Sequence, residues 1–125
     1  MTKKSRLEDL EIYKISLMIS DKIWDLIIHW DNFSRNNIGG QLIRAIDSVG
    51  ANISEGYGRG SKVDNARIVK IARGSLFESK HWLNVSHRRK LLSDKDFKEI
   101  LDDVESLLPR LSAYINYLTK SSTPK

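Results

Sequence analysis

The sequence predicts an all-α protein that folds as a single up-down-up-down four-helix bundle over residues 1–125. Apolar residues recur at helical spacing in four segments, near residues 8–30, 38–57, 61–91 and 94–119. Glycine-rich and Ser-Asp stretches between these segments are typical of helix ends and starts. A chain of 125 residues is long enough for one hydrophobic core but not for two.

The first predicted helix, residues 8–30, carries two neighbouring apolar stripes. Together they span about 220° of the helix, whereas a surface helix of a monomer typically shows an apolar stripe of somewhat over 100°. Since a bundle buries one side of each helix, we expect the second side to meet another copy of the chain. The alternative is that long side chains of the same chain cover it. One stripe contains Leu10, Tyr13, Leu17, Trp24 and Ile28; the other contains Ile12, Ile15, Ile19, Ile23, Leu26 and Trp30.

The second predicted helix, residues 38–57, has a polar stripe beside its apolar one. Fully exposed stripes tend to be rich in Lys and Glu, so this mixture of Ser, Asn and Arg favours buried or interfacial hydrogen bonding. We expect Glu55 to pair with Arg59 or with Arg73. The predicted structural network consists of Arg44, Ser48, Asn52, Glu55, Arg59, Arg73 and Glu78.

The stretch SEGYGRGSK, residues 54–62, raises the question of a phosphate-binding loop. Such a loop needs a strand before it, whereas a helical pattern precedes these glycines. Lys62 also follows Ser61 instead of preceding a Ser or Thr. We therefore expect a helix end with a left-handed glycine, a sharp turn at residues 58–60, and a new helix capped by Ser61 with Asp64.

The third predicted helix, residues 61–91, separates a core arc from a basic arc. The core arc contains Ile68, Ile71, Ala72, Ser75, Leu76, Ser79, Trp82 and Leu83. The candidate nucleic-acid contacts on the basic side are Arg67, Lys70, Lys80, Arg88, Arg89 and Lys90. The alternative is a solvated face with salt bridges to neighbouring helices, in which the last cations stabilise the helix C-terminus. Base reading is not expected, because no aromatic residues are interleaved with the basic ones.

The fourth predicted helix, residues 94–119, has a heptad-like apolar seam that stays in phase across Pro109. We therefore expect a bend at Pro109 and not a break. Ser93 and Asp94 suit the N-cap.

Composition disfavours several classes of function. The chain has no cysteine, and its three histidines lack metal-ligand spacing. No nucleophile–base pair stands out, so we expect no active site, no metal and no cofactor. No apolar run approaches the roughly 20 residues that cross a membrane, which predicts a cytoplasmic protein. The net charge of +5 permits a polyanionic partner.

Two motifs resemble a known family. RAIDSVGANISEGYGR (Arg44–Arg59) and ARGSLFES (Ala72–Ser79), with the opening LEDLEIYKIS (Leu7–Ser16), are similar to the proteins encoded in intervening sequences of bacterial 23S rRNA genes, once labelled S23 ribosomal proteins. The resemblance implies a four-helix bundle that assembles into a ring, commonly a homopentamer, without enzymatic activity. It also implies kinship with the accessory protein of diversity-generating retroelements, which binds nucleic acid and a reverse transcriptase.

Two functional hypotheses follow from the sequence. The first is an oligomer that binds RNA or DNA without sequence preference through the basic face of its third helix. The second is a scaffold that acts through protein–protein contacts, in which the basic third helix of one chain meets the acidic start of the fourth helix of another. The second leaves room for a protein partner of unknown identity.

Overall fold

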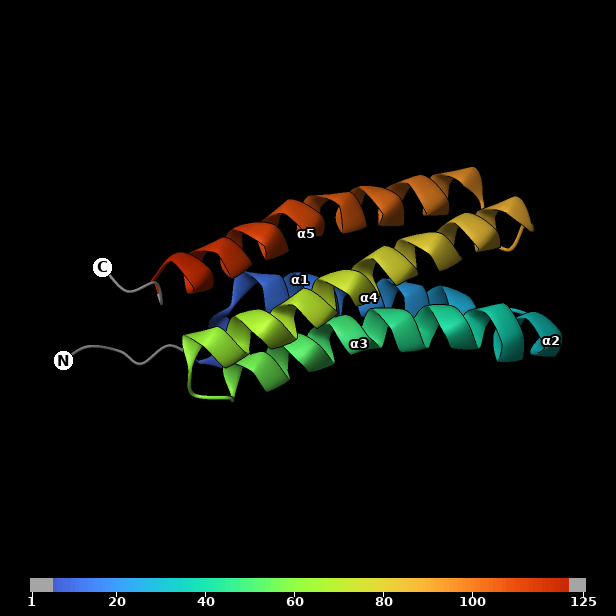
Figure 1. Ribbon diagram of the computed structural model, residues 1–125. Helices are drawn as coiled ribbons and strands as arrows, with labels where there is room; N and C mark the ends of the chain where they lie inside the picture. Colours follow the sequence, from blue (N-terminus) through green and yellow to red (C-terminus); the bar gives the residue numbers. More distant parts are fainter. Residues whose placement is uncertain (1–5, 122–125) are drawn as a thin grey trace.

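Four long helices make up the bundle in this computed structural model, which describes residues 6–121 and has no strand within that range. They are α1 (Glu11–Ile27), α3 (Gly40–Tyr57), α4 (Lys62–Arg88) and α5 (Asp94–Ser121), and they run alternately up and down (Figure 1). A short 3-10 helix, η1 (Leu7–Asp9), precedes α1. A one-turn helix, α2 (Asn32–Ser34), and a π-helical turn, η2 (Arg35–Gly39), lie between α1 and α3. The all-α class and the four-helix bundle predicted from the sequence are confirmed.

The core lies between the four helices. α1 and α4 each pack against both α3 and α5, which places α1 and α4 at opposite corners of the bundle. Ile19, Ile46, Leu76 and Leu107, one from each long helix, are completely buried. Each helix therefore contributes one apolar side to a shared centre, as helical periodicity requires.

The first helix is shorter than the predicted segment. α1 ends at Ile27, where the backbone N–H groups of His29 and Trp30 donate to the oxygens of Leu26 and Ile27, three residues back. The carboxylate of Asp31 then accepts a hydrogen bond of 3.1 Å from the backbone N–H of Ser34 and begins a separate turn, α2. Trp30 lies in the connection and still packs against the core. The predicted helix was too long because Trp30, in the connection, also contributes a core side chain and so extends the apolar periodicity beyond the end of α1.

Between α3 and α4 the chain reverses through residues 58–61, as predicted. Gly60, with φ of +85°, is the glycine in the left-handed region, whereas Gly58 is right-handed. The prediction that a glycine directly ends the preceding helix in the left-handed conformation was therefore wrong by position. Ser61 Oγ accepts a 3.1 Å hydrogen bond from the backbone N–H of Asp64, which confirms Ser61 as the cap of α4.

The fourth long helix runs without interruption through Pro109. Ser93 caps it, since its Oγ accepts a 3.1 Å hydrogen bond from the backbone N–H of Asp96. Val104 and Leu111, five residues before and two residues after Pro109, are both completely buried. The predicted seam is therefore continuous, and the proline lies on the exposed side where its missing N–H disturbs no packing.

One predicted core residue of α4 lies at the surface. Ile71 is 50% exposed, although its neighbours Ile68 and Ala72 are buried. It belongs to the outward side of α4, together with the exposed side chains of Val63 and Phe77. The core arc predicted for this helix was therefore too wide by one position.

Candidate nucleic-acid interface

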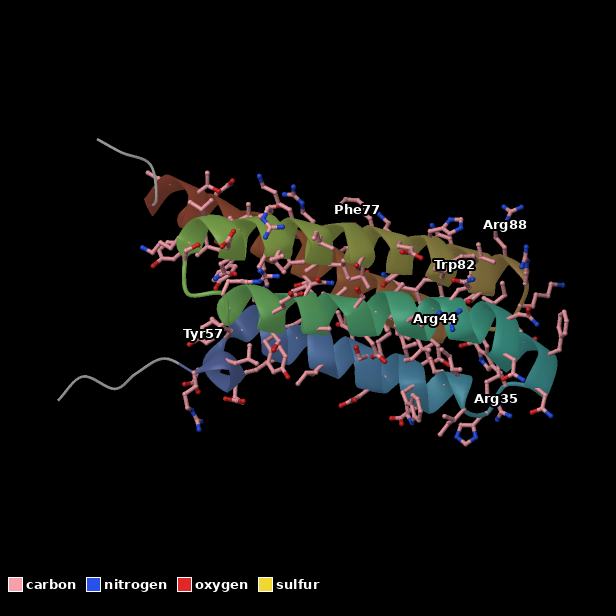
Figure 2. All side chains as sticks on the ribbon, turned by 60° about the horizontal axis from the view of Figure 1, so that its bottom comes forward. Arg35, Arg44, Tyr57, Phe77, Trp82 and Arg88 are labelled. Atoms are coloured by element: carbon pink, nitrogen blue, oxygen red, sulfur yellow. The ribbon has the colours of Figure 1, made fainter. Side chains whose placement is uncertain are left out.

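The candidate nucleic-acid contacts lie along α4, which at 1.5 Å per residue is about 40 Å long, and in the turn that follows it, where Arg89 and Lys90 lie. Lys70, Arg88, Arg89 and Lys90 are exposed and form no ion pair with any residue in the described range. Figure 2 shows Arg88 projecting from the end of this helix. These four cations are the part of the basic face with no carboxylate partner in the described chain.

The other two candidate contacts have carboxylate partners. The guanidinium of Arg67 lies 3.6 Å from a carboxylate oxygen of Asp64, one turn earlier on α4. Lys80 Nζ lies 3.4 Å from a carboxylate oxygen of Glu105 on α5. Both pairs are at least partly exposed, so each is worth about 0–1 kcal/mol and leaves its cation able to exchange partners.

The polar stripe of α3 forms one compact contact with α4. Ser48 Oγ lies 3.0 Å from Ser75 Oγ across the two helices. Asn52 donates from Nδ2 to the backbone oxygen of Ser48 at 2.8 Å and to Ser48 Oγ at 2.9 Å. This half-buried cluster connects α3 and α4 through small polar side chains.

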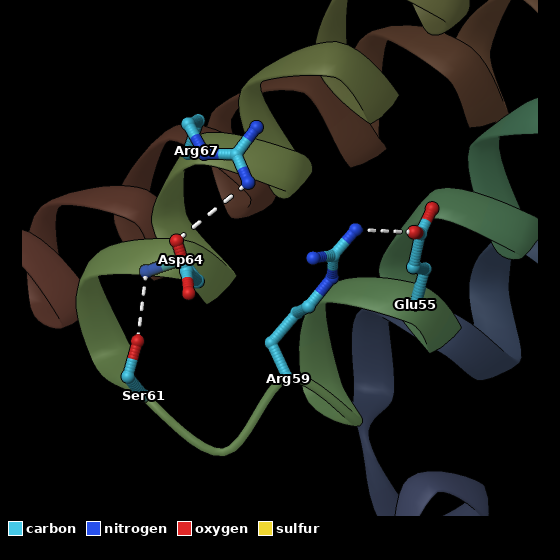
Figure 3. A network of polar contacts seen from close by, with 5 residues as sticks. All are labelled: Glu55, Arg59, Ser61, Asp64 and Arg67. Atoms are coloured by element: carbon cyan, nitrogen blue, oxygen red, sulfur yellow. Dashed lines mark hydrogen bonds and ion pairs between the residues drawn. The ribbon is translucent and has the colours of Figure 1, made fainter.

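The charged members of the predicted network lie apart from that cluster. Glu55 and Arg59 form a 2.7 Å ion pair, which is one of the two pairings expected for Glu55 (Figure 3). Arg73 instead donates to Ser112 Oγ on α5 at 3.1 Å. Glu78 accepts from Trp82 Nε1 at 3.2 Å, and Arg44 is exposed. Within one chain the predicted set is thus divided into separate contacts; its burial between copies stays a prediction.

The glycine-rich turn has the contacts of a helix connection. Figure 3 shows Ser61, Asp64 and Arg67 linked at the start of α4, while the Glu55–Arg59 pair closes the end of α3. A helix precedes this turn and another helix follows it, so the strand that precedes a phosphate-binding loop is absent here.

Two titratable side chains, His87 and Lys22, make contacts between helices. His87 Nε2 lies 2.7 Å from a carboxylate oxygen of Asp94, and its ring stacks on Phe97. Hydrogen bonds to Asp103 and Glu99 raise the pKa of the Lys22 ammonium, which ties α1 to α5. Within residues 6–121 no three His, Asp or Glu side chains are grouped as metal ligands, and no described helix could span a membrane.

One feature of the surface escaped the sequence analysis. An open hollow of about 380 Å³ lies at the end of the bundle near the α3–α4 turn. Its lining comes from three separate stretches of the sequence and includes Leu10, Tyr57, Lys62, Asn65 and Tyr114. Only the fold brings these segments together, so no local sequence signal could have indicated the hollow.

The two apolar stripes of α1 differ in burial. Ile19 and Ile23 of one stripe are buried, whereas Leu17, Trp24 and Ile28 of the other are exposed. The prediction that one chain buries only one side of this helix agrees with these positions.

Comparison with known proteins decides the family. The family model described as 23S rRNA-intervening sequence protein matches residues 8–113. The chain belongs to this family. No curated protein matches the sequence.

A solved structure shares the family's fold. It is a crystal structure of a protein with unknown function from the S23 ribosomal protein family of Bacteroides thetaiotaomicron VPI-5482. The two chains are 24% identical, with a TM-score of 0.73, over 83% of this chain and 97% of the other. At this identity the likeness establishes the four-helix fold alone. The function has to be inferred from the surface of this chain.

Proposed function

We propose that this family member is a non-enzymatic, cytoplasmic oligomer that binds RNA or DNA with little sequence preference. Its assembly would be a ring, most simply a pentamer. The observation that carries the proposal is the row of cations on α4 and the turn after it, of which Lys70, Arg88, Arg89 and Lys90 have no carboxylate partner in the described chain. Ion pairs within the described chain do not account for these four cations, whereas a polyanion would be attracted by them.

Repetition would strengthen a weak contact. One copy offers few phosphate contacts, but a ring repeats them once per subunit on a continuous surface. Each phosphate neutralised releases counterions, so log affinity should fall linearly with log salt, by about 0.9 per phosphate for duplex DNA and 0.7 for single strands. Binding through phosphates also accounts for the expected lack of sequence preference.

The test is a filter-binding titration with a structured RNA and a duplex DNA at two salt concentrations. Replacing Arg88, Arg89 and Lys90 with Ser should weaken binding and flatten the salt dependence, with the oligomer intact. The matched control replaces three exposed lysines on α1 and α5, Lys14, Lys98 and Lys120, with Ser. It lowers net charge equally and should weaken binding less. Wild-type protein that retains no nucleic acid at low salt would refute the proposal.

A scaffold acting through protein–protein contacts is the second candidate. The observation favouring it is the exposed apolar side of α1, formed by Leu17, Trp24 and Ile28. Pairing between basic α4 and acidic α5 already occurs within one chain at Lys80 and Glu105, and the same pairing could join copies. If the triple Ser variant of α4 splits the oligomer, the basic residues serve assembly and this candidate is favoured.

A further inference from the structure

Two turns that are far apart in sequence meet at one end of the bundle. The α1–α2 connection with η2 and the α4–α5 turn lie at the same end (Figure 1). Trp30 from the first connection and Leu92 from the second pack into one apolar cluster, together with Leu42 and Leu83. This shared packing holds the two turns in a fixed relation. Arg35 and Arg88 both appear at this end in Figure 2.

The first turn displays an aromatic ring to solvent. Phe33 is 77% exposed, more than any other large apolar side chain of the described residues. The backbone beneath it is well held: Asn37 Nδ2 donates to the backbone oxygen of Phe33 at 2.8 Å, and Arg35 donates to Asn32 Oδ1. Packing within the chain therefore does not explain why an aromatic residue occupies this position. The ring is exposed to solvent on a turn that hydrogen bonds hold in place.

The second turn carries a cation at a conformationally costly position. Lys90 has φ of +62°, in the left-handed region where glycine is preferred. The turn is closed by a 2.8 Å hydrogen bond from the backbone N–H of Leu91 to the oxygen of Ser86. The other tight turn of the chain uses Gly60 for the same conformation. At Lys90 the chain thus keeps a side chain, flanked by Arg88 and Arg89, where glycine would be less strained.

An exposed aromatic ring and unpaired cations at the same end of the bundle match the chemistry of a single-stranded nucleic acid. Unpaired bases stack on aromatic faces regardless of sequence, while Arg and Lys hold the phosphates. A duplex hides its base faces and could use only the cations. Nearby acids, Asp94 and Asp96 on α5, reduce the local charge but leave Arg88, Arg89 and Lys90 without a partner among the described residues.

We infer that this end of the bundle is a single-strand-binding surface, in which Phe33 stacks on a base and Arg88, Arg89 and Lys90 contact phosphates. The inference rests on the proposed function and adds to it a ligand class and an aromatic contact. Sequence position alone did not indicate the surface, because Phe33 is far from the basic cluster along the chain.

The test compares a labelled single strand of mixed sequence with the duplex of the same sequence, by fluorescence anisotropy with the full chain. Phe33→Ala should weaken single-strand binding about fivefold or more and leave duplex binding unchanged. Phe77→Ala is the matched control, because Phe77 is also exposed but lies midway along α4. An equal loss in the control would place stacking elsewhere and overturn the inference.

Lys90→Gly supplies a second, independent readout. It should weaken single-strand binding while raising the midpoint of thermal unfolding, since glycine relieves the left-handed backbone. Misfolding would instead lower the midpoint of thermal unfolding and weaken binding together. A higher midpoint with unchanged affinity would count against Lys90 as a contact.

The outcomes separate this inference from the proposed function. Wild-type protein that binds neither strand form at low salt refutes both. Equal binding of both forms, insensitive to Phe33→Ala, refutes the single-strand surface alone. If Phe33→Ala changes the mass measured by light scattering, another copy of the chain covers the ring, and the inference is again refuted.

Discussion

Gly56 on α3 faces the side-chain amide of Asn65 on α4 so closely that a Cβ on Gly56 would lie 2.7 Å from Asn65 Oδ1. The same Cβ would lie 3.1 Å from the backbone oxygen of Asn65 and 3.3 Å from a methyl carbon of Val69. The amide has little freedom to move away, because its Nδ2 donates to the Tyr114 hydroxyl at 3.1 Å. The absence of a side chain at Gly56 therefore sets how closely the two helices approach.

Gly56→Ala should destabilise the fold. Alanine gains about 1 kcal/mol in helix propensity, but overpacking a tight contact costs about 1–3 kcal/mol, and here one colliding atom belongs to the backbone. We expect the free energy of unfolding, measured in urea, to fall by about 1 kcal/mol or more. Unchanged or increased stability would mean that α3 and α4 separate more easily than their contacts indicate.

Gly74→Ala should have the opposite effect and is the matched control. Gly74 lies inside α4 on the exposed side, and a Cβ there would meet no atom within 4 Å. The substitution should raise the free energy of unfolding by about 0.5–1 kcal/mol, because it removes only backbone freedom from the unfolded chain. A loss of stability that grows with protein concentration would indicate that another molecule approaches α4 at this glycine.

Periodicity predicted the parts of the fold that depend on one helix at a time. The buried seam of α5 and the cap at Ser61 are local properties of spacing and side-chain chemistry, and both were correct. The width of an arc depends on the crossing of neighbouring helices, which is why Ile71 was assigned to the core although it is exposed.

The candidate sites show the same limit more strongly. Helical spacing placed the basic residues on α4, but it could not indicate that Lys80 meets Glu105 or that Arg73 meets Ser112, because those partners lie on another helix. It grouped Glu55 with Ser48 and Asn52 as one network, whereas the side chains form separate contacts. Which residues share the end of the bundle is decided by the turns, where apolar periodicity carries no information.

Glu55→Ala tests whether another copy covers the polar stripe. In one chain Glu55 and Arg59 are 52% and 41% exposed, and such surface pairs contribute about 0–1 kcal/mol. We expect a loss of less than about 1 kcal/mol in dilute, monomeric protein, but a loss of up to about 3–5 kcal/mol where an oligomer buries the pair. Urea unfolding at several protein concentrations measures both.

The control for this substitution is Lys98→Ala, which breaks the exposed Lys98–Asp102 pair of the same spacing on α5. Its effect should be small at every concentration. A loss for Glu55→Ala that is equally small at all concentrations would contradict burial of the pair between copies.

Asp47→Asn should change how stability depends on pH. Desolvation by the neighbouring chain raises the pKa of the Asp47 carboxyl, although the residue is exposed, and Asp21 adds to the rise, while a hydrogen bond from Ser20 opposes it. A raised pKa means that the folded chain holds this proton more tightly than the unfolded chain. The resulting stability is complete below the ordinary value of 3.8 and is lost as pH rises through the folded-state pKa.

The variant keeps a neutral side chain at all pH values. It should therefore match the wild-type protein in thermal unfolding near pH 3 and be the more stable of the two at pH 7. Asp102→Asn, at an exposed position on α5, is the control and should not reproduce that pattern. A difference between Asp47→Asn and wild type that is the same at both pH values would show that the carboxyl has no shifted proton affinity.

Trp24→Lys tests the exposed side of α1 as a subunit contact. Trp24 is 55% exposed in one chain, so lysine there should cost the isolated fold little. In a contact between copies, the same lysine would bury an unpaired charge, which is strongly unfavourable. We expect light scattering at micromolar concentration to report an oligomer for wild type and a single chain for the variant, with helical content unchanged by circular dichroism. Val63→Lys adds the same charge at an exposed apolar position on α4, at the opposite corner of the bundle, and should leave the mass unchanged. A wild-type mass of one chain, or dissociation by both variants alike, would remove the reason for assigning the contact to α1.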